Sequence, residues 1–377
     1  MLLVYFTFAQ QELSVKWNKG FQAKDSTGNF KFKIGARTFF DIAYINQSAS
    51  IENKFGKQTL GGEFRKAMFQ SSGKIHGNVK YITQFDFSSG TISFNEVWIE
   101  INKVPIVGNI RLGNFKEPMR FENLTSSKSS LAMENSFTAK MLPGYASGML
   151  LHKYLVKNKI NLQFAAVLNS DAVGKDLNND EKLNLDGRIV YLPLKNENSF
   201  MHTSIYYSYR TNKNKSFTWK FRPESHIANN YINFNLNAEN MNVVGFEYIF
   251  SHKQFTLHTE YLSQNINEIS NDKYFYSYVI YGVWRITGES RKYKDPLSGY
   301  DTFEPKKNVS EGGIGGLEFV VRYSEVDLEN YGKIQNITTG LNWYLNSNTR
   351  FMINYIISNL DGIGLTQIVQ MRTQINF

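Results

Sequence analysis

The chain has 377 residues, a formal net charge of +9 and no cysteine. A soluble protein of this length usually forms two or more domains, whereas one large β-barrel can hold the whole chain. Without cysteine, disulfides, thiol chemistry and cysteine-ligated metals are excluded. The basic residues are scattered rather than gathered in a tail or patch. This pattern argues against a nucleic-acid partner and favours a positive field along a surface or a pore.

Aromatic residues make up 15% of the chain and hydrophobic residues 42%. No apolar run approaches the roughly 18 residues of a membrane helix. The aromatic excess suits β-strands and the aromatic girdles of an outer-membrane barrel. Only 7 prolines are present, as repeated strand pairing requires. The composition therefore favours an all-β protein.

The first ten residues, MLLVYFTFAQ, resemble the back half of a signal peptide. The segment is short and has no basic start, so an ordinary first strand is the alternative. We divide the chain into a residual signal-peptide-like segment at 1–10, an N-terminal lead-in at 11–29 and a transmembrane barrel at 30–377.

Extended segments follow one another from residue 30 onward, and helical periodicity is hard to find. Counting antiparallel strands back from a periplasmic C-terminus gives sixteen, an even number, as single-chain bacterial barrels have. The predicted strands are 30–45, 62–74, 78–87, 91–102, 108–116, 146–156, 159–168, 184–194, 199–210, 240–250, 254–266, 274–287, 316–328, 333–345, 349–359 and 366–377. The predicted fold class is an all-β, transmembrane antiparallel β-barrel of about sixteen strands.

Three of the predicted connections are long, at 117–145, 211–239 and 288–315. Others are tight turns, such as 251–253 and 346–348. Short periplasmic turns and longer external loops are the usual asymmetry, yet the connection at 288–315 falls on the periplasmic side. Loops of this length are usually functional or disordered. We expect some of the long connections to fold into the lumen and narrow it.

The last strand shows how the two walls of such a barrel are encoded. One face carries Val369, Met371, Ile375 and Phe377, and the other carries Gln370, Arg372, Gln374 and Asn376. In a soluble sandwich the polar face would lie in bulk water. In a transmembrane barrel the apolar face meets lipid and the polar face a wet lumen. The same alternation in most of the other strands favours the barrel.

Several segments resemble those of a known family. They are 28–37 (GNFKFKIGAR), 110–122 (IRLGNFKEPMRFE), 124–127 (LTSS), 221–226 (FRPESH), 285–289 (RITGE), 319–324 (FVVRYS) and 340–346 (GLNWYLN). In this order, from about Trp17 to Phe377, the chain is similar to the phosphate-selective porin O/P family. The resemblance implies a sixteen-stranded outer-membrane barrel, a homotrimer, inward-folded loops and an arginine-lined path for phosphate-type anions. Phosphate selectivity belongs to particular members, so the resemblance alone does not transfer it.

Strand parity places a set of arginines opposite the aliphatic face. The set is Arg37, Arg111, Arg188, Arg285, Arg322, Arg350 and Arg372. On the lipid side near the midplane each would cost roughly 2–4 kcal/mol, so the membrane interpretation directs them into the lumen. Guanidinium groups there would attract anions and bind phosphate oxygens in a fork. Alternatively, each pairs with an acid such as Glu96, Glu100 or Glu318 and only supports the wall.

The long connections carry further basic residues. Lys116, Arg120 and Lys128 lie in or next to the first, Lys220 and Arg222 in the second, and Arg291, Lys292, Lys306 and Lys307 in the third. If the connections fold inward, these side chains form a constriction. The alternative is solvated loop charge.

The six histidines show no metal-ligand spacing, and no cofactor motif is found. His202 and Ser204 share a strand face, as in a lipid-cleaving dyad, but their face is the lumenal one, so a polar wall pair is favoured. The glycine-rich segment 312–316 lacks the lysine and the helix of a phosphate loop. We therefore expect no catalytic and no metal site.

The predicted function is passive diffusion of small anions, phosphate or pyrophosphate first, through an outer-membrane porin. The expected partners are outer-membrane lipid, small inorganic anions and two further copies of the chain. A general porin with weak anion preference is one alternative. The other is a plugged barrel that acts as a receptor or scaffold. We expect Arg111→Ala or Arg322→Ala to weaken phosphate block of the chloride current.

Overall fold

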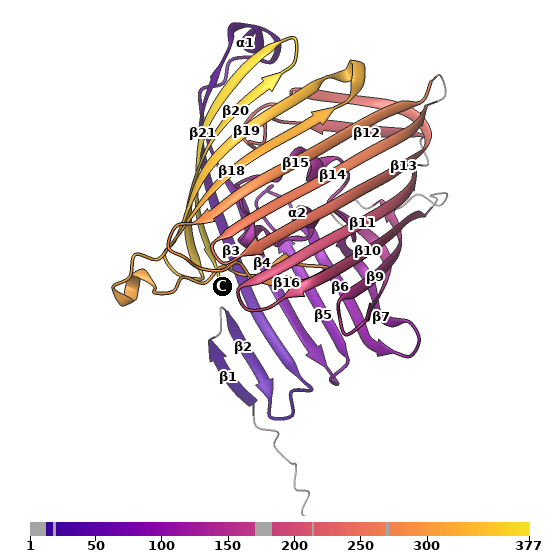
Figure 1. Ribbon diagram of the computed structural model, residues 1–377, viewed down its shortest axis with the longest axis vertical. Helices are drawn as coiled ribbons and strands as arrows, with labels where there is room; N and C mark the ends of the chain where they lie inside the picture. Colours follow the sequence, from indigo (N-terminus) through magenta and orange to yellow (C-terminus); the bar gives the residue numbers. More distant parts are fainter. Residues whose placement is uncertain (1–12, 18–19, 170–182, 213–214, 269–270) are drawn as a thin grey trace, which may run out of the picture.

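The computed structural model describes residues 13–17, 20–169, 183–212, 215–268 and 271–377 (Figure 1). The signal-peptide-like interpretation of 1–10 concerns residues outside this part of the chain. Strands dominate the architecture, and the described helices are short. None of the helices in the described ranges is long and apolar enough to cross a membrane.

Sixteen antiparallel strands form one closed barrel. They are β3 (Lys31–Gln47), β4 (Leu60–Ile75), β5 (Val79–Asp86), β6 (Ser93–Val104), β7 (Gly108–Lys116), β8 (Tyr145–Leu155), β9 (Ile160–Asn169), β10 (Asn184–Lys195), β11 (Ser199–Thr211), β13 (Ile232–His252), β14 (Phe255–Glu268), β15 (Lys273–Arg285), β18 (Gly316–Asp327), β19 (Lys333–Tyr344), β20 (Thr349–Leu360) and β21 (Gly364–Asn376). The ring closes where β21 pairs with β3, with Arg372 opposite Asp41. Closure leaves no unpaired edge of the kind that an open sheet has. The closed antiparallel barrel confirms the predicted fold class.

The faces follow the predicted alternation. On β21, Val369, Met371 and Ile375 are 38–56% exposed, whereas Gln370 and Arg372 are buried. Since the exposed side chains point outward, the apolar face forms the outside of the barrel and the polar face lines its interior. A sandwich with its polar face in water is excluded.

Each predicted strand has a counterpart, and the largest boundary error is at 240–250. That strand is β13, which begins at Ile232 because its first part pairs with the unpredicted strand β12 (Ser216–Phe221) beyond the ring. The lead-in at 11–29 contains a second unpredicted hairpin. Its strands β1 (Leu13–Trp17) and β2 (Phe21–Asp25) add to the start of β3 and extend past the end of the barrel that carries the C-terminus (Figure 1).

All three long connections enter the barrel. The first contains α2 (Phe121–Leu124), η1 (Ser127–Ser129) and α3 (Phe137–Lys140), and most of its side chains are buried. We call 117–144 the inward loop. The second connection places Glu224 and Ser225 inside the barrel, where both are buried. The third places β16 (Tyr293–Asp295) and β17 (Gly299–Tyr300) there. The remaining short elements are α1 (Ala49–Phe55), η2 (Val309–Glu311) and η3 (Glu329–Tyr331). The predicted inward folding is confirmed.

The inward segments pack against one side of the barrel. Phe121 of α2 lies with its ring centre 4.9 Å from that of His202 and 5.3 Å from that of His258. From the third connection, Tyr293 and Tyr300 pack on the same Phe121. We name the end of the barrel that carries the C-terminus periplasmic, as predicted from the sequence. This aromatic cluster fills the interior beside β11, β14 and β15. The open space that remains lies on the side of β3 to β8.

Candidate functional site

A cavity of about 160 Å³ lies between the inward loop and the wall formed by β3 to β8. Six basic side chains line this cavity, and we call them the constriction cations: Arg37, Arg65, Lys66, Lys116, Lys140 and Arg372. The acidic residues in the lining are Glu96 and Glu134. A smaller cavity of about 30 Å³ shares Arg37 and adds Lys33 and Lys128. Basic groups thus outnumber acidic ones in this part of the lumen.

A β-bulge brings two adjacent basic residues into the cavity. On β4, Phe64 faces Phe40 and Lys66 faces Phe39, so Arg65 is an extra residue between two ladder pairs. In a regular strand neighbouring side chains point to opposite faces, but a bulge resets this alternation. Arg65 and Lys66 therefore both reach the lumen. Strand parity alone could not assign them, and no motif in the sequence marks the bulge.

Lys66 differs from its neighbours because the described residues give it no hydrogen bond or ion pair, although it lines the cavity. Arg37 makes one bond, in which Nη1 donates to Ser127 Oγ at 3.0 Å. Lys116 donates from Nζ to the carbonyl oxygens of Asn123 at 2.6 Å and Thr125 at 2.9 Å. The cavity thus presents at least one lysine side chain whose donors are free to bind a solute.

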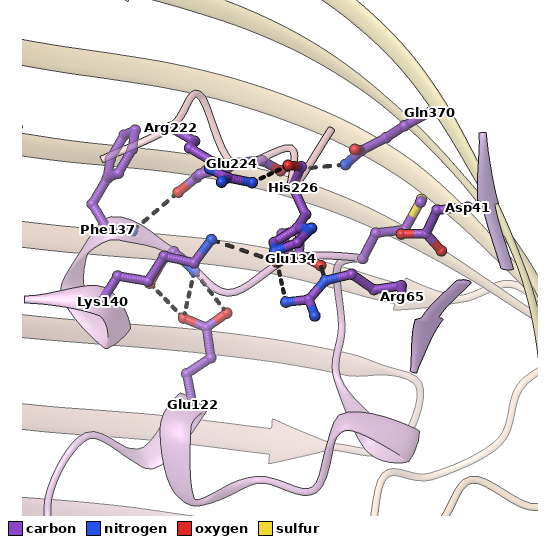
Figure 2. A network of polar contacts seen from close by, with 12 residues as sticks. Asp41, Arg65, Glu122, Glu134, Phe137, Lys140, Arg222, Glu224, His226 and Gln370 are labelled. Atoms are coloured by element: carbon purple, nitrogen blue, oxygen red, sulfur yellow. Dashed lines mark hydrogen bonds and ion pairs between the residues drawn. The ribbon is translucent and has the colours of Figure 1, made fainter. Parts of the chain in front are cut away.

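Glu134 of the inward loop is the acidic centre of the site (Figure 2). It lies 2.8 Å from Arg65, 3.5 Å from Lys140 and 3.0 Å from Arg372. Burial alone would raise the pKa of Glu134, but Arg65, Lys140 and Arg372 together hold it well below its usual range. The carboxylate therefore stays ionised, and it fixes the loop against β4 and β21.

The arginines predicted from parity all lie on the inner face, but most are already engaged. Six of the seven are at most 9% exposed, while Arg37 is half-buried. Their nearest acidic partners are Glu100 for Arg111 (2.6 Å), Glu247 for Arg188 (2.5 Å), Glu318 for Arg285 (3.5 Å), Glu224 for Arg322 (2.6 Å) and Asp41 for Arg372 (2.7 Å). Arg350 donates to Ser130 O and to Gln374 Oε1, both at 2.7 Å. Of the seven, Arg37 and Arg372 line the larger cavity.

Four arginines, three on different strands and Arg291 in the third long connection, hold one stretch of the inward loop, 129–134, by its carbonyl oxygens. Arg372 reaches Met133 O at 2.5 Å, Arg322 reaches Glu134 O at 2.8 Å and Arg350 reaches Ser130 O at 2.7 Å. Arg291 bonds Ser129 O in the same way. Each charge-assisted bond satisfies a buried backbone acceptor. These four arginines fix this stretch of the loop against the inner face of the barrel.

The loop cations predicted to form the constriction divide into three groups. Lys116 and Lys128 line the two cavities. The second group is engaged in bonds to the protein itself. Arg120 is buried and donates to three carbonyl oxygens of 139–143. Arg291 is buried and donates to Ser129 O, and Arg222 donates to Asn230 Oδ1. Lys220 is exposed on β12, and Lys306 lies at the periplasmic mouth.

A row of lysines continues from the cavities towards the periplasmic end. Lys24, Lys31, Lys74 and Lys80 are direct cross-strand neighbours on β2, β3, β4 and β5. We call them the lysine row. Lys80 lies 3.4 Å from Glu100, whereas the other three have no salt bridge to a described residue. Like charges directly opposite each other on neighbouring strands repel. An anion bound between these lysines would relieve the repulsion.

The mouth of the barrel is a vestibule of about 1480 Å³. Its lining includes Lys157, Lys159, Lys195, Lys253, Lys292 and Lys306. The same lining carries Glu197, Glu289, Asp301 and Glu304, and Lys292 is paired with Glu304 at 3.2 Å, so the vestibule has a modest excess of basic groups.

The sequence matches the family model described as phosphate-selective porin O and P over residues 32–377. The chain belongs to the phosphate-selective porin O and P family. It is 22% identical to Porin O of Pseudomonas aeruginosa, over 93% of this porin and 88% of that protein. It is 20% identical to an uncharacterised protein of Caulobacter vibrioides, over 89% of this porin and 70% of that protein. The family and the fold place this porin in the bacterial outer membrane.

Solved structures with the same fold are outer-membrane channels. The porin overlaps the anion-selective porin from Comamonas acidovorans with a TM-score of 0.57, 12% identity and coverage of 92% of this chain and 100% of that one. The channel DcaP of Acinetobacter baumannii gives a TM-score of 0.60 and 10% identity, over 94% and 99%. At these identities the comparison shows the fold.

His202 and Ser204 do not form a dyad in this porin. His202 Nε2 lies 2.9 Å from Glu247 Oε2, and Ser204 Oγ accepts from Arg188 Nε at 3.0 Å. Both side chains are buried in the lumen wall. Within the described ranges no group of three or more His, Asp or Glu is arranged to hold a metal ion.

Proposed function

We propose that this porin passes small inorganic anions by passive diffusion, phosphate or pyrophosphate first. The observation that carries the proposal is the 160 Å³ cavity, lined by six basic and two acidic side chains. Such a site attracts anions and repels cations. The names of two similar proteins, Porin O of a phosphate-selective family and an anion-selective porin, support the same solute class.

Lys66 is the residue we expect to contact the anion directly. Passage requires contacts that are weak and numerous enough for an ion to step onward. A guanidinium already paired with a carboxylate offers little to a passing ion, whereas the Lys66 ammonium has its donors free. Arg37, Lys128 and the lysine row would take the anion in turn towards the periplasm. The other arginines act mainly by holding the inward loop in place.

The test is phosphate block of the chloride current in planar bilayers. We expect Lys66→Gln to weaken the block and to shift the reversal potential in a salt gradient towards zero. Lys220→Gln is the matched control, because Lys220 is exposed on β12 and should leave both values unchanged. Equal block in wild type and Lys66→Gln would overturn the proposed site.

A plugged receptor or scaffold is the second candidate, because three inward connections occupy much of the interior. That candidate predicts no steady single-channel events in a bilayer. A general porin with weak anion preference predicts steady events and no phosphate block. The same recordings therefore separate all three functions.

We also propose that the porin forms a homotrimer in outer-membrane lipid, as the family resemblance implies. The mass of the detergent-solubilised complex tests this, with the detergent contribution subtracted. A monomeric mass in mild detergent would contradict the trimer and leave the channel proposal unaffected.

A further inference from the structure

An apolar groove of about 430 Å³ lies on the outer wall of the barrel, around Gly282 of β15. In the strand register Gly282 stands between Leu257 of β14 and Val321 of β18, and a side chain at Gly282 would meet no atom within 4 Å. The missing side chain therefore leaves a trough between two aliphatic ridges. The groove continues past Phe255, Trp284 and Phe319.

This part of the wall has the pattern of a surface in contact with lipid. Towards the loop end it carries the exposed tyrosines Tyr261 and Tyr274, whose hydroxyls are 2.8 Å apart. Towards the periplasmic end it carries Phe255, Trp284 and Phe319, which are 38–56% exposed. Aromatic girdles at both ends of an apolar band mark the two membrane interfaces. The groove lies in the periplasmic girdle, so its level is that of the inner leaflet.

Basic and polar groups stand at the periplasmic rim of the groove. His252 lines the groove, and the adjacent Lys253, in the turn between β13 and β14, lines the neighbouring vestibule. Lys253 is exposed and has no salt bridge to a described residue. Lipid tails are as apolar as the wall itself, so hydrophobicity alone cannot select an occupant. Selectivity would come from the shape of the trough and from the charge at its rim.

We propose that this groove binds one acyl chain of an anionic phospholipid of the inner leaflet, with the lipid phosphate at Lys253 and His252. The groove itself lies on the outer wall, so its occupancy does not depend on the proposed function, although Lys253 also lines the vestibule. It would hold the lipid at a fixed place on the wall, beside the turn that borders the periplasmic vestibule.

Native mass spectrometry of the porin, reconstituted with phosphatidylglycerol and phosphatidylethanolamine and then extracted in mild detergent, tests the site. We expect wild type to retain phosphatidylglycerol and Gly282→Phe, which fills the trough, to lose it. The matched control is Gly187→Phe on β10, where an added side chain also meets no atom within 4 Å, and which should retain the lipid. Lys253→Gln should keep a bound lipid but lose the preference for the anionic headgroup.

Other outcomes would overturn the proposal. Gly282→Phe could retain as much lipid as wild type, or Gly187→Phe could lose as much as Gly282→Phe. Gly282→Phe could also separate the subunits, which would assign the groove to a second copy of the chain. Resistance of the barrel to heat in a gel-shift assay shows that the variants are folded. Ion selectivity of Gly282→Phe should match wild type, so failure here leaves the proposed function intact.

Discussion

The Arg372 guanidinium of β21 lies 3.0 Å from the Glu134 carboxylate of the inward loop. The same guanidinium donates to both Asp41 oxygens, each at 2.7 Å, across the seam where β21 meets β3. One side chain thus joins the closure of the barrel to the wall of the constriction. The position of the loop depends on a contact that exists only once the barrel has closed.

Glu134→Gln should loosen the inward loop, because it removes the charge that Arg65, Lys140 and Arg372 share. We expect a larger single-channel conductance with more frequent open-channel fluctuations, and stronger anion selectivity since a negative charge is lost. Single-channel recording in planar bilayers measures both. Glu311→Gln, in the exposed turn at η2, is the control. An unchanged conductance would show that the loop is held by its backbone bonds alone.

Arg322→Ala should destabilise the barrel. It leaves Glu224 buried without its 2.6 Å partner and removes a bond to Glu134 O. Breaking one side of a buried pair costs about 3–5 kcal/mol. The denaturant midpoint of refolded porin in detergent measures this cost. The double variant Arg322→Met with Glu224→Gln should recover part of it, and additive losses would contradict a direct pairing.

Arg111→Ala, by contrast, changes a residue outside the larger cavity that is paired with Glu100. Its effect on phosphate block should be smaller than that of Lys66→Gln. Comparing the two block constants in the same membrane ranks the paired arginine against the free lysine.

Anion selectivity should weaken as pH rises through about 7. Burial, together with the nearby Arg37, lowers the pKa of Lys128 to about 7. A lowered pKa means that Lys128 is charged below that pH and neutral above it. Reversal potentials in potassium chloride gradients at pH 6 and pH 8 measure the change, without the titration of phosphate itself. In Lys128→Arg the charge persists, so the selectivity of this variant should vary less over this range than that of wild type.

The lysine row should raise anion flux most at low salt. The Debye length falls from about 10 Å at 0.1 M to about 3 Å at 1 M, so exposed charges act over shorter distances. We expect the pair Lys31→Gln and Lys74→Gln to lower chloride conductance at 0.1 M and to match wild type at 1 M. Lys57→Gln, at the loop end beside Glu52, is the control. A deficit that is equal at both salt concentrations would exclude a field effect.

The strands and their faces could be read from the chain alone. Side chains in a strand alternate with period two, so the sequence alone places Val369 and Arg372 on opposite walls. The free-energy cost of placing an arginine in contact with lipid then predicts that these arginines face the lumen. The long connections were also visible, because 117–145 and 288–315 break the alternation.

The partners of the inward groups could not be predicted in this way. Whether Arg322 faces open water or Glu224 depends on contacts between residues 98 positions apart, which local periodicity does not encode. The bulge that turns both Arg65 and Lys66 inward appears only when β4 is paired with β3. The alternation of side chains belongs to a single strand, so one segment of the sequence is enough to predict it. Whether a basic side chain of the constriction is paired or unpaired depends on how three inward segments meet inside the closed barrel. The tertiary structure therefore determines which positive charges remain available to a solute.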